Sequence, residues 1–200
     1  MKILVVSGFL GAGKTTFIRT LAERTKKDFA VMENEYGAVN VDGDLLEQTK
    51  DLNIWELTEG CICCSMQNDF ATSILTIANT VDPEYLIVEP TGVGMLSKII
   101  ENIQKIEYER ITLLEPLTIL DGTMYDRCMS EFSEICEDQI QSAGRILVSK
   151  MESVAENERC SLKQKLTALN PEAEICVTIP KRTAVKQSFV DACEELGCNK

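Results

Sequence analysis

The sequence predicts an α/β fold in which a mostly parallel sheet is flanked by helices on both faces. Short apolar runs alternate with longer amphipathic segments along the chain, the pattern of strands joined by crossover helices. The opening run, Lys2–Ser7, is almost continuously apolar, as a strand buried on both faces should be. Directly after it, Phe17, Ile18 and Leu21 recur at helical spacing.

The remaining elements follow from the same pattern in chain order. Strands are expected at Lys2–Ser7 and at residues 29–32, 52–57, 85–88, 117–120, 146–148 and 174–177. Helices are expected at residues 14–26, 67–80, 93–106, 131–141, 156–169 and 181–196, with a loop at residues 33–44. No repeat or linker separates these elements, so residues 1–200 are expected to form a single domain.

Charge and hydropathy exclude two classes of partner. The 200 residues carry a formal net charge of −12, which argues against nucleic acid because binding the phosphate backbone needs a basic patch. No apolar run reaches the roughly 18 residues that a membrane span needs, so no membrane partner is expected. The first apolar run stops at Gly8 and fits a buried strand better than a signal peptide. We therefore expect a cytoplasmic protein.

The chain has nine cysteines and no histidine. Without an export signal, the cysteines are expected to be thiols and not a disulfide framework. Any transition-metal site must then use thiolates and carboxylates, and no histidine can serve as a general base. Outside the cluster at residues 61–64, most cysteines are expected to be small apolar fillers; these are Cys128, Cys136, Cys160, Cys176, Cys193 and Cys198.

A glycine-rich segment between the first strand and the first helix has the pattern of a phosphate-binding loop. Residues 8–15, GFLGAGKT, fit G-x-x-x-x-G-K-[ST]. Gly8, Gly11 and Gly13 let the backbone turn tightly, so that successive N–H groups, with that of Ala12 among them, point at phosphate oxygens. The N-terminus of the following helix adds a partial positive charge. This segment predicts binding of a nucleoside triphosphate.

The three residues that follow the glycines carry the polar side chains of this site. Lys14 is expected to reach the β- and γ-phosphates and to be catalytic, because it neutralises charge that develops on the γ-phosphoryl group. The hydroxyl of Thr15 is expected to bind Mg²⁺, and Thr16 to help hold the α-phosphate.

A second candidate catalytic residue, Glu89, ends the strand predicted at residues 85–88. An acid at the carboxyl end of a buried strand points into the crevice where open α/β sheets bind ligands. Glu89 is expected to hold Mg²⁺ through water or to orient the attacking water. Gly92, three residues later, can offer a backbone N–H to the γ-phosphate and so detect its loss.

Three thiols lie within four residues at Cys61, Cys63 and Cys64. Neighbouring cysteines seldom reach disulfide geometry, whereas thiolates at this density suit soft metals such as Zn, Ni, Co, Cu(I) or iron. Three thiolates leave a tetrahedral ion one ligand short. A nearby Glu, water or a second subunit could supply that ligand, and a turn of buried, inert thiols is the alternative reading.

Taken together, these segments resemble the CobW/UreG/HypB family of P-loop GTPases, and its CobW-like branch above all. The resemblance covers about the first 125 residues and rests on four segments, residues 8–16, 33–37 with Asp42, 59–64 and 89–92. It implies a SIMIBI-like G domain that binds GTP or GDP with Mg²⁺, and a role in metal delivery or metallocentre assembly. It also implies a client metalloenzyme or its assembly factor as partner, and it allows a nucleotide- or metal-dependent homodimer.

The resemblance assigns further site residues. Asp42 falls in the first switch loop of the family, where it would contact Mg²⁺ or the catalytic water. Glu33, together with Cys63 and Cys64, matches a metal-binding arrangement of the family, and Cys61 belongs to the same motif. The metal is expected to be Zn, Co or Ni.

The guanine-reading motif Asn-Lys-x-Asp of the family falls on residues 149–152. Lys150 can lie along the base, and Glu152 can accept hydrogen bonds from the guanine edge. Ser149 and Glu152 depart from the motif, so guanine preference is weakened and ATP use stays open. The chain also lacks the histidine-rich tracts of many relatives and is too short for their C-terminal domain.

These observations favour a slow GTPase that acts as a metallochaperone or metallocentre-assembly factor. Slow turnover is expected because the sequence has no histidine and no evident arginine finger. Two alternatives stay open. One is a metal-binding or metal-sensing protein that keeps its nucleotide without turnover, and the other is a small-molecule kinase, although no arginine-rich lid is evident.

Overall fold

The computed structural model describes residues 1–25, 28–33, 53–56, 67–152 and 154–177. The strands are β1 Lys2–Ser7, β2 Phe29–Glu33, β3 Asn53–Glu56, β4 Tyr85–Glu89, β5 Thr112–Leu113, β6 Leu117–Asp121, β7 Arg145–Ser149 and β8 Glu174–Val177. The helices are α1 Lys14–Thr25, α3 Gln67–Thr80, α4 Leu96–Gln104, α5 Tyr125–Glu131, α6 Ser133–Gln141 and α7 Glu156–Leu169, with a short 3₁₀ helix at Gly122–Met124.

The strands form one sheet whose order is β3-β2-β4-β1-β6-β7-β8, with β5 also beside β1. Every pairing between these described strands is parallel, which confirms the predicted sheet. The chain runs outward from β1 to β2 and β3, returns to β4, and then crosses to β6 on the other side of β1. A parallel sheet binds ligands at such a reversal of strand order, outside the carboxyl ends of the strands.

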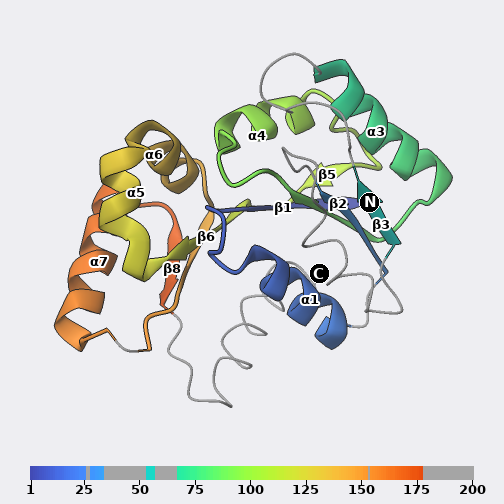
Figure 1. Ribbon diagram of the computed structural model, residues 1–200. Coiled ribbons are helices and arrows are strands. Elements are labelled where there is room, and N and C mark those ends of the chain that lie inside the picture. The colour runs from blue at the N-terminus through green and yellow to red at the C-terminus, as the bar shows by residue number, and fades with distance from the viewer. Residues whose placement is uncertain (26–27, 34–52, 57–66, 153, 178–200) are drawn as a thin grey trace.

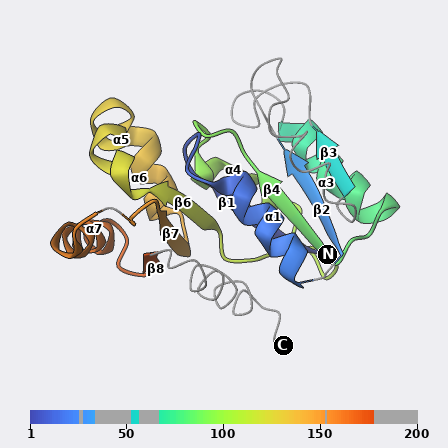
Figure 2. The same ribbon diagram turned by 60° about the horizontal axis from the view of Figure 1, so that its bottom comes forward.

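Helices cover both faces of the sheet, as predicted. α1 packs on one face through Phe17, Ile18 and Leu21, whereas α3 to α7 bury their apolar residues on the opposite face (Figure 1). Figure 2 shows α1 in front of the sheet with α4 behind it. The two faces explain why β1 is continuously apolar, since alternate side chains enter separate cores.

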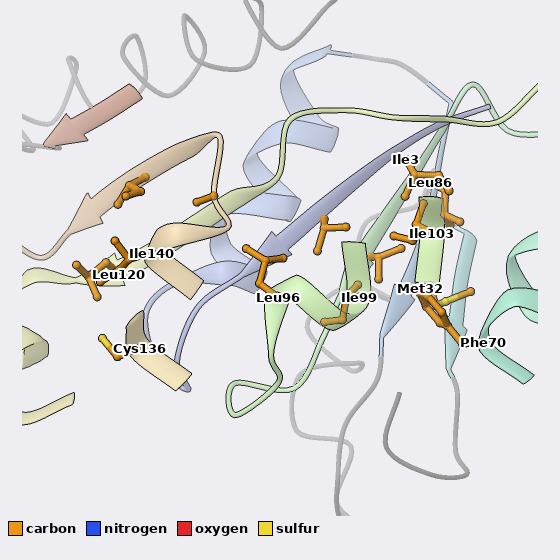
Figure 3. Packing of buried hydrophobic residues seen from close by; sticks show 14 of the residues in the cluster. Ile3, Met32, Phe70, Leu86, Leu96, Ile99, Ile103, Leu120, Cys136 and Ile140 are labelled. Carbon is orange, nitrogen blue, oxygen red and sulfur yellow. The ribbon is translucent and has the colours of Figure 1, made fainter. Parts of the chain in front are cut away.

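The central strands show this alternation residue by residue. In β1, Ile3 and Val5 belong to the core beneath α3 and α4, whereas Leu4 and Val6 pack with α1. Figure 3 shows the first of these cores, in which Leu96 and Ile99 of α4 lie over the sheet. Burial on both faces places the ends of β1 and β4 rigidly at the centre of the molecule.

The structure corrects several predicted boundaries. One helix was expected at residues 131–141, but α5 ends at Glu131 and α6 begins at Ser133, because Phe132 leaves the helical region at φ −139° and ψ 43°. α5 was missed because only Tyr125 and Cys128 of its seven residues are buried, too few to show a helical period. β5, two residues long, was also missed. The helix expected at residues 181–196 lies outside the described residues.

The helix expected at residues 93–106 is shorter in the structure, where α4 spans Leu96–Gln104. Residues 92–95 form a turn, in which Gly94 N donates a hydrogen bond to Thr91 O at 2.9 Å. This turn connects β4 to α4 and lies next to the predicted phosphate loop.

Candidate functional site

The segment between β1 and α1 has the backbone of a phosphate-binding loop. Gly8, Gly11 and Gly13 have φ values of 137°, 75° and 109°, a region that side-chain-bearing residues rarely occupy. A Cβ on Gly8 would overlap the carbonyl oxygen of Ile119 in β6, so glycine is required there for two reasons. α1 begins at Lys14, directly after the last of these glycines, which directs the helix N-terminus at the loop.

Lys14 lies inside this loop and is almost fully buried. Its side chain is 7% exposed, and its Nζ lies 3.7 Å from Oε1 of Glu89 and 3.4 Å from the carbonyl oxygen of Phe9. Buried lysines require a paired charge, and the carboxylate at the end of β4 provides it. The structure therefore brings together two residues that the sequence predicted as catalytic.

Thr15 shares the same carboxylate. Its hydroxyl donates a hydrogen bond to Glu89 Oε1 at 3.5 Å, so a hydroxyl and a carboxylate converge at the start of α1. Mg²⁺ prefers oxygen ligands of these two kinds. The residues present therefore fit the magnesium ion that accompanies a bound triphosphate. Thr16 is exposed, and its carbonyl oxygen accepts a hydrogen bond from the hydroxyl of Thr20.

A second buried carboxylate lies beside Glu89. Glu33 ends β2, is 7% exposed and is aligned in register with Glu89 of β4. Residues aligned in register on neighbouring parallel strands are about 4.8 Å apart and project to the same face. The backbone of Glu56, which ends β3, pairs in register with that of Glu33. The carboxyl edge of three neighbouring strands thus ends in glutamate.

The turn after β4 packs directly against the phosphate loop. A Cβ on Gly92 would lie 2.6 Å from the backbone nitrogen of Leu10 and 3.1 Å from the carbonyl carbon of Phe9. Only a glycine permits this approach of one backbone to another. The predicted γ-phosphate contact at Gly92 is therefore next to the loop that would hold the phosphates.

Ser149, at the end of β7, joins the opposite side of the loop. Its hydroxyl lies 2.8 Å from the carbonyl oxygen of Ala12 and 3.3 Å from that of Leu120. The sequence assigned Ser149 to the base-reading motif, and the structure shows its side chain bonded to the phosphate loop and to β6. Ser149 is aligned in register with Asp121, the last residue of β6, which places its hydroxyl beside the carbonyl oxygen of Leu120.

Lys150 follows Ser149 in a left-handed conformation, with φ 59°. Its Nζ forms an ion pair with Asp121 Oδ2 at 2.8 Å, while Thr123 donates two hydrogen bonds to Asp121 Oδ1, from its N–H at 3.0 Å and its hydroxyl at 2.6 Å. Burial alone would raise the pKa of Asp121, but the hydrogen bonds from Lys150 and Thr123 outweigh it and lower this pKa. Glu152, two residues after Lys150 in the chain, is exposed.

The role of Asp121 was missed in the sequence. The signal was present, since Asp121 ends a buried strand as Glu89 does, and the same rule about strand ends applies to both. Predictions for Asp42, Cys61, Cys63 and Cys64 lie outside the described residues. Within the described part of the chain, no group of three or more Cys, Asp or Glu side chains could hold a metal ion.

The four remaining central cysteines differ in their environments. Cys128 and Cys136 are buried, as expected of apolar fillers, whereas Cys160 is exposed and Cys176 is half-buried. Cys160 of α7 faces solvent and is therefore not one of the apolar fillers expected among most of these cysteines. Cys193 and Cys198 lie outside the described residues.

Comparison with known protein families gives a match over residues 2–177. The matching model describes the nucleotide-binding domain of the CobW/HypB/UreG family. The chain belongs to this family. The P-loop and the parallel sheet described above are thus those of a CobW/HypB/UreG nucleotide-binding domain.

Individual relatives agree with this assignment. The zinc chaperone YjiA of Escherichia coli is 33% identical over 181 residues, which cover 86% of this chain and 56% of YjiA. The chain spans about half the length of the curated relatives it matches.

Two solved structures share the fold. Zn(II)-bound YjiA GTPase from E. coli superimposes with a TM-score of 0.64 at 24% identity, covering 88% of this chain and 57% of that one. HypB from Helicobacter pylori in complex with nickel gives a TM-score of 0.68 at 22% identity, covering 96% of this chain and 85% of that one. None of the described helices combines the length and the hydropathy that crossing a membrane requires.

Proposed function

We propose that this protein is a P-loop GTPase that serves as a metallochaperone or metallocentre-assembly factor. In this proposal, GTP hydrolysis is coupled to the binding or delivery of a transition metal through Cys61, Cys63 and Cys64. The observation that carries the proposal is the buried Lys14–Glu89 pair in the phosphate loop, with Glu33 aligned beside Glu89. Phosphate chemistry and a second carboxylate for a metal then share one edge of the sheet.

Phosphate binding would use groups that already face one another. Lys14 Nζ, now 3.7 Å from Glu89, would turn to the β- and γ-phosphates, and the N–H groups of residues 8–16 would surround the phosphate oxygens. Magnesium, when bound with the nucleotide, would offset negative charge on these oxygens. Glu89 would then be released from Lys14 to accept a hydrogen bond from the attacking water.

Slow hydrolysis is part of this proposal. The chain contains no histidine, and in this proposal a carboxylate, Glu89 or Asp42, orients the water. Arg127, which lies near the loop on α5, is paired with Glu131 at 3.0 Å. A client protein, or a second copy of the chain, would therefore be needed to complete the site and accelerate the reaction.

Base recognition would fall to Lys150 and Glu152. The ion pair with Asp121 holds Lys150 at the carboxyl end of β7, the side of the sheet to which the base would extend from the loop. Ser149, bonded to Ala12 O, would fix the position of this segment relative to the phosphates. We propose guanine as the preferred base, with ATP as the competitor against which preference must be measured.

The thiolate motif follows a strand at the same edge of the sheet. β3 ends at Glu56, five residues before Cys61, and five residues span at most about 18 Å. Because β3 is adjacent to β2, this short separation would allow Cys63 and Cys64 to approach Glu33. Zinc in the YjiA structure and nickel in the HypB structure support Zn or Ni as the cargo, with Co as a further candidate.

The partner is proposed to be a client metalloenzyme or its assembly factor. Leu10 and Val93, at 82% and 55% exposure, are large apolar side chains on the phosphate loop and on the neighbouring turn. Apolar residues exposed at a site that changes with nucleotide state fit a partner that detects this state. A nucleotide- or metal-dependent homodimer would use the same residues.

The decisive experiment measures nucleotide affinity and GTP turnover with and without Zn²⁺, Ni²⁺ and Co²⁺, in the presence of Mg²⁺. We expect the cognate metal to change GTP affinity or turnover. A double variant, Cys63→Ala with Cys64→Ala, should lose this response and keep nucleotide binding. Cys160→Ala is the matched control, because it removes an exposed thiol of α7 and should leave the response intact.

Three results would contradict the proposal in different ways. Identical kinetics with and without every metal would remove the coupling. Absence of turnover, with equal metal affinity in the GDP and GTP states, would favour a metal-binding protein that keeps its nucleotide. Transfer of labelled γ-phosphate to a metabolite would favour a small-molecule kinase.

A further inference from the structure

The turn that carries Gly92 is hydrogen-bonded to a buried glutamine side chain of α6. Gln139 is 1% exposed, and its side-chain Nε2 lies 3.2 Å from the carbonyl oxygen of Gly92 and 3.0 Å from that of Gly94. An amide nitrogen carries two hydrogens, so one side chain satisfies two carbonyls of the same turn. These residues are 47 and 45 positions apart in the chain.

Gln139 is itself fixed in place by its neighbours. Its backbone carbonyl accepts a hydrogen bond from the hydroxyl of Thr118 at 2.7 Å, and Thr118 is a buried residue of β6. Asp138, the preceding residue, accepts a hydrogen bond at its Oδ2 from Ser97 N at 3.1 Å. Two consecutive residues of α6 therefore hold both ends of the segment from Gly92 to the first turn of α4.

The other side of the same turn lies on the phosphate loop. The close approach of Gly92 to the backbone of Phe9 and Leu10 leaves no room for the turn to move inward. The two hydrogen bonds from the Gln139 amide also tie the turn to α6. The Gly92 turn is thus confined between the loop that would hold the phosphates and the buried side chain of α6.

We propose that Gln139 is a positioning residue for the γ-phosphate contact. Its side-chain amide holds the Gly92 turn in the position from which the Gly92 N–H can reach a γ-phosphate. Gln139 itself does not contact the nucleotide in this proposal. The inference rests on the proposed GTPase function, since it assumes that Gly92 is the contact that distinguishes GTP from GDP.

The substitution Gln139→Met tests this role. Methionine keeps a similar length and volume but donates no hydrogen bond, so the carbonyls of Gly92 and Gly94 lose their partner. We expect the affinity for a non-hydrolysable GTP analogue to fall about tenfold, the equivalent of ~1.4 kcal/mol. The affinity for GDP should stay within about twofold of the wild-type value. GDP has no γ-phosphate, so it makes no contact with the Gly92 N–H that displacement of the turn could weaken.

Asn170→Leu is the matched control. Asn170 is also a buried amide, and its Nδ2 donates to the carbonyl oxygens of Ile140, Gln141 and Ala143 at the end of α6. It has no hydrogen bond to the Gly92 turn among the described residues. Both variants lose buried hydrogen bonds of α6, but only Gln139→Met should change the ratio of GTP-analogue to GDP affinity.

A second readout is independent of nucleotide. Amide hydrogen exchange in the nucleotide-free protein should accelerate at Gly94, whose N–H bonds to Thr91 O within the turn, in Gln139→Met and not in Asn170→Leu. Unchanged exchange would overturn the positioning role of Gln139, and so would an equal loss of affinity for both nucleotides. If the wild type bound no GTP, the proposed function would fail, while the exchange result would still decide whether Gln139 holds the turn.

Discussion

The buried pair of Lys14 and Glu89 is the most informative contact at the scale of single residues. A lysine that is 7% exposed with one carboxylate at 3.7 Å is stable only while a negative charge remains beside it. In the ligand-free protein Glu89 supplies that charge, and a triphosphate would supply more of it. The ammonium group of Lys14 can therefore change its partner from Glu89 to the phosphates and remain paired with a negative charge in both states.

Replacing Lys14 by methionine should abolish most nucleotide affinity. Hydrogen bonds from a charged group contribute about 1.5–3 kcal/mol, so affinity for GTP should fall about 100-fold, as measured by titration of a fluorescent GTP analogue. Lys165→Met is the control, since Lys165 pairs with Asp126 on the exposed surface and its loss removes the same charge. Equal affinity of Lys14→Met and the wild type would disprove the role of Lys14.

At the scale of elements, the unit formed by β1, the loop and α1 depends on glycines with different requirements. Gly8 and Gly11 both have positive φ values, 137° and 75°. A Cβ on Gly8 would meet the backbone of Ile119, whereas a Cβ on Gly11 would have no atom within 4 Å. Gly8 therefore permits the close contact between the loop and β6, whereas Gly11 is needed only because its backbone has a positive φ.

This difference predicts unequal losses of stability. Gly11→Ala should reduce the free energy of unfolding by about 1–2 kcal/mol, the cost of a left-handed conformation. Gly8→Ala adds displacement of the Ile119 backbone and should cost about 4 kcal/mol. Denaturant titration measures both values. A loss at Gly8 no greater than that at Gly11 would show that the loop can leave β6 freely.

At the scale of the whole molecule, the sheet collects groups from distant parts of the chain at one edge. Glu33, Glu89, Asp121 and Ser149 each end a strand, and all of these strands are parallel in one sheet. The carboxyl ends of parallel strands meet at the same edge, so their polar groups converge there. The layers of helices determine in turn which other side chains are accessible.

Accessibility across the molecule predicts which thiols react. Burial, followed by the nearby Cys128 and Glu137, raises the pKa of Cys136 to about 12, so at pH 8 only about one molecule in 10⁴ carries the reactive thiolate. Iodoacetamide at pH 8 should therefore modify the exposed Cys160 and spare Cys136 in the folded protein. Peptide mass spectrometry measures the modification at each site.

Denaturant provides the control for this experiment. Once the chain unfolds, Cys136 loses its burial and should react as Cys160 does. Modification of Cys136 in the folded protein at a rate near that of Cys160 would show that α5 and α6 open readily, which their buried packing does not predict.

The sequence by itself determined the features that are written in contiguous residues. The phosphate loop, β1 and α1 were predicted because their glycine spacing and apolar periodicity are local. The acid at residue 89 was predicted because it follows a buried strand. The tertiary structure alone decided which distant groups meet, namely Lys14 with Glu89, Ser149 with Ala12, Lys150 with Asp121, and Gln139 with Gly92. Such contacts depend on strand order and helix packing, which no local pattern encodes.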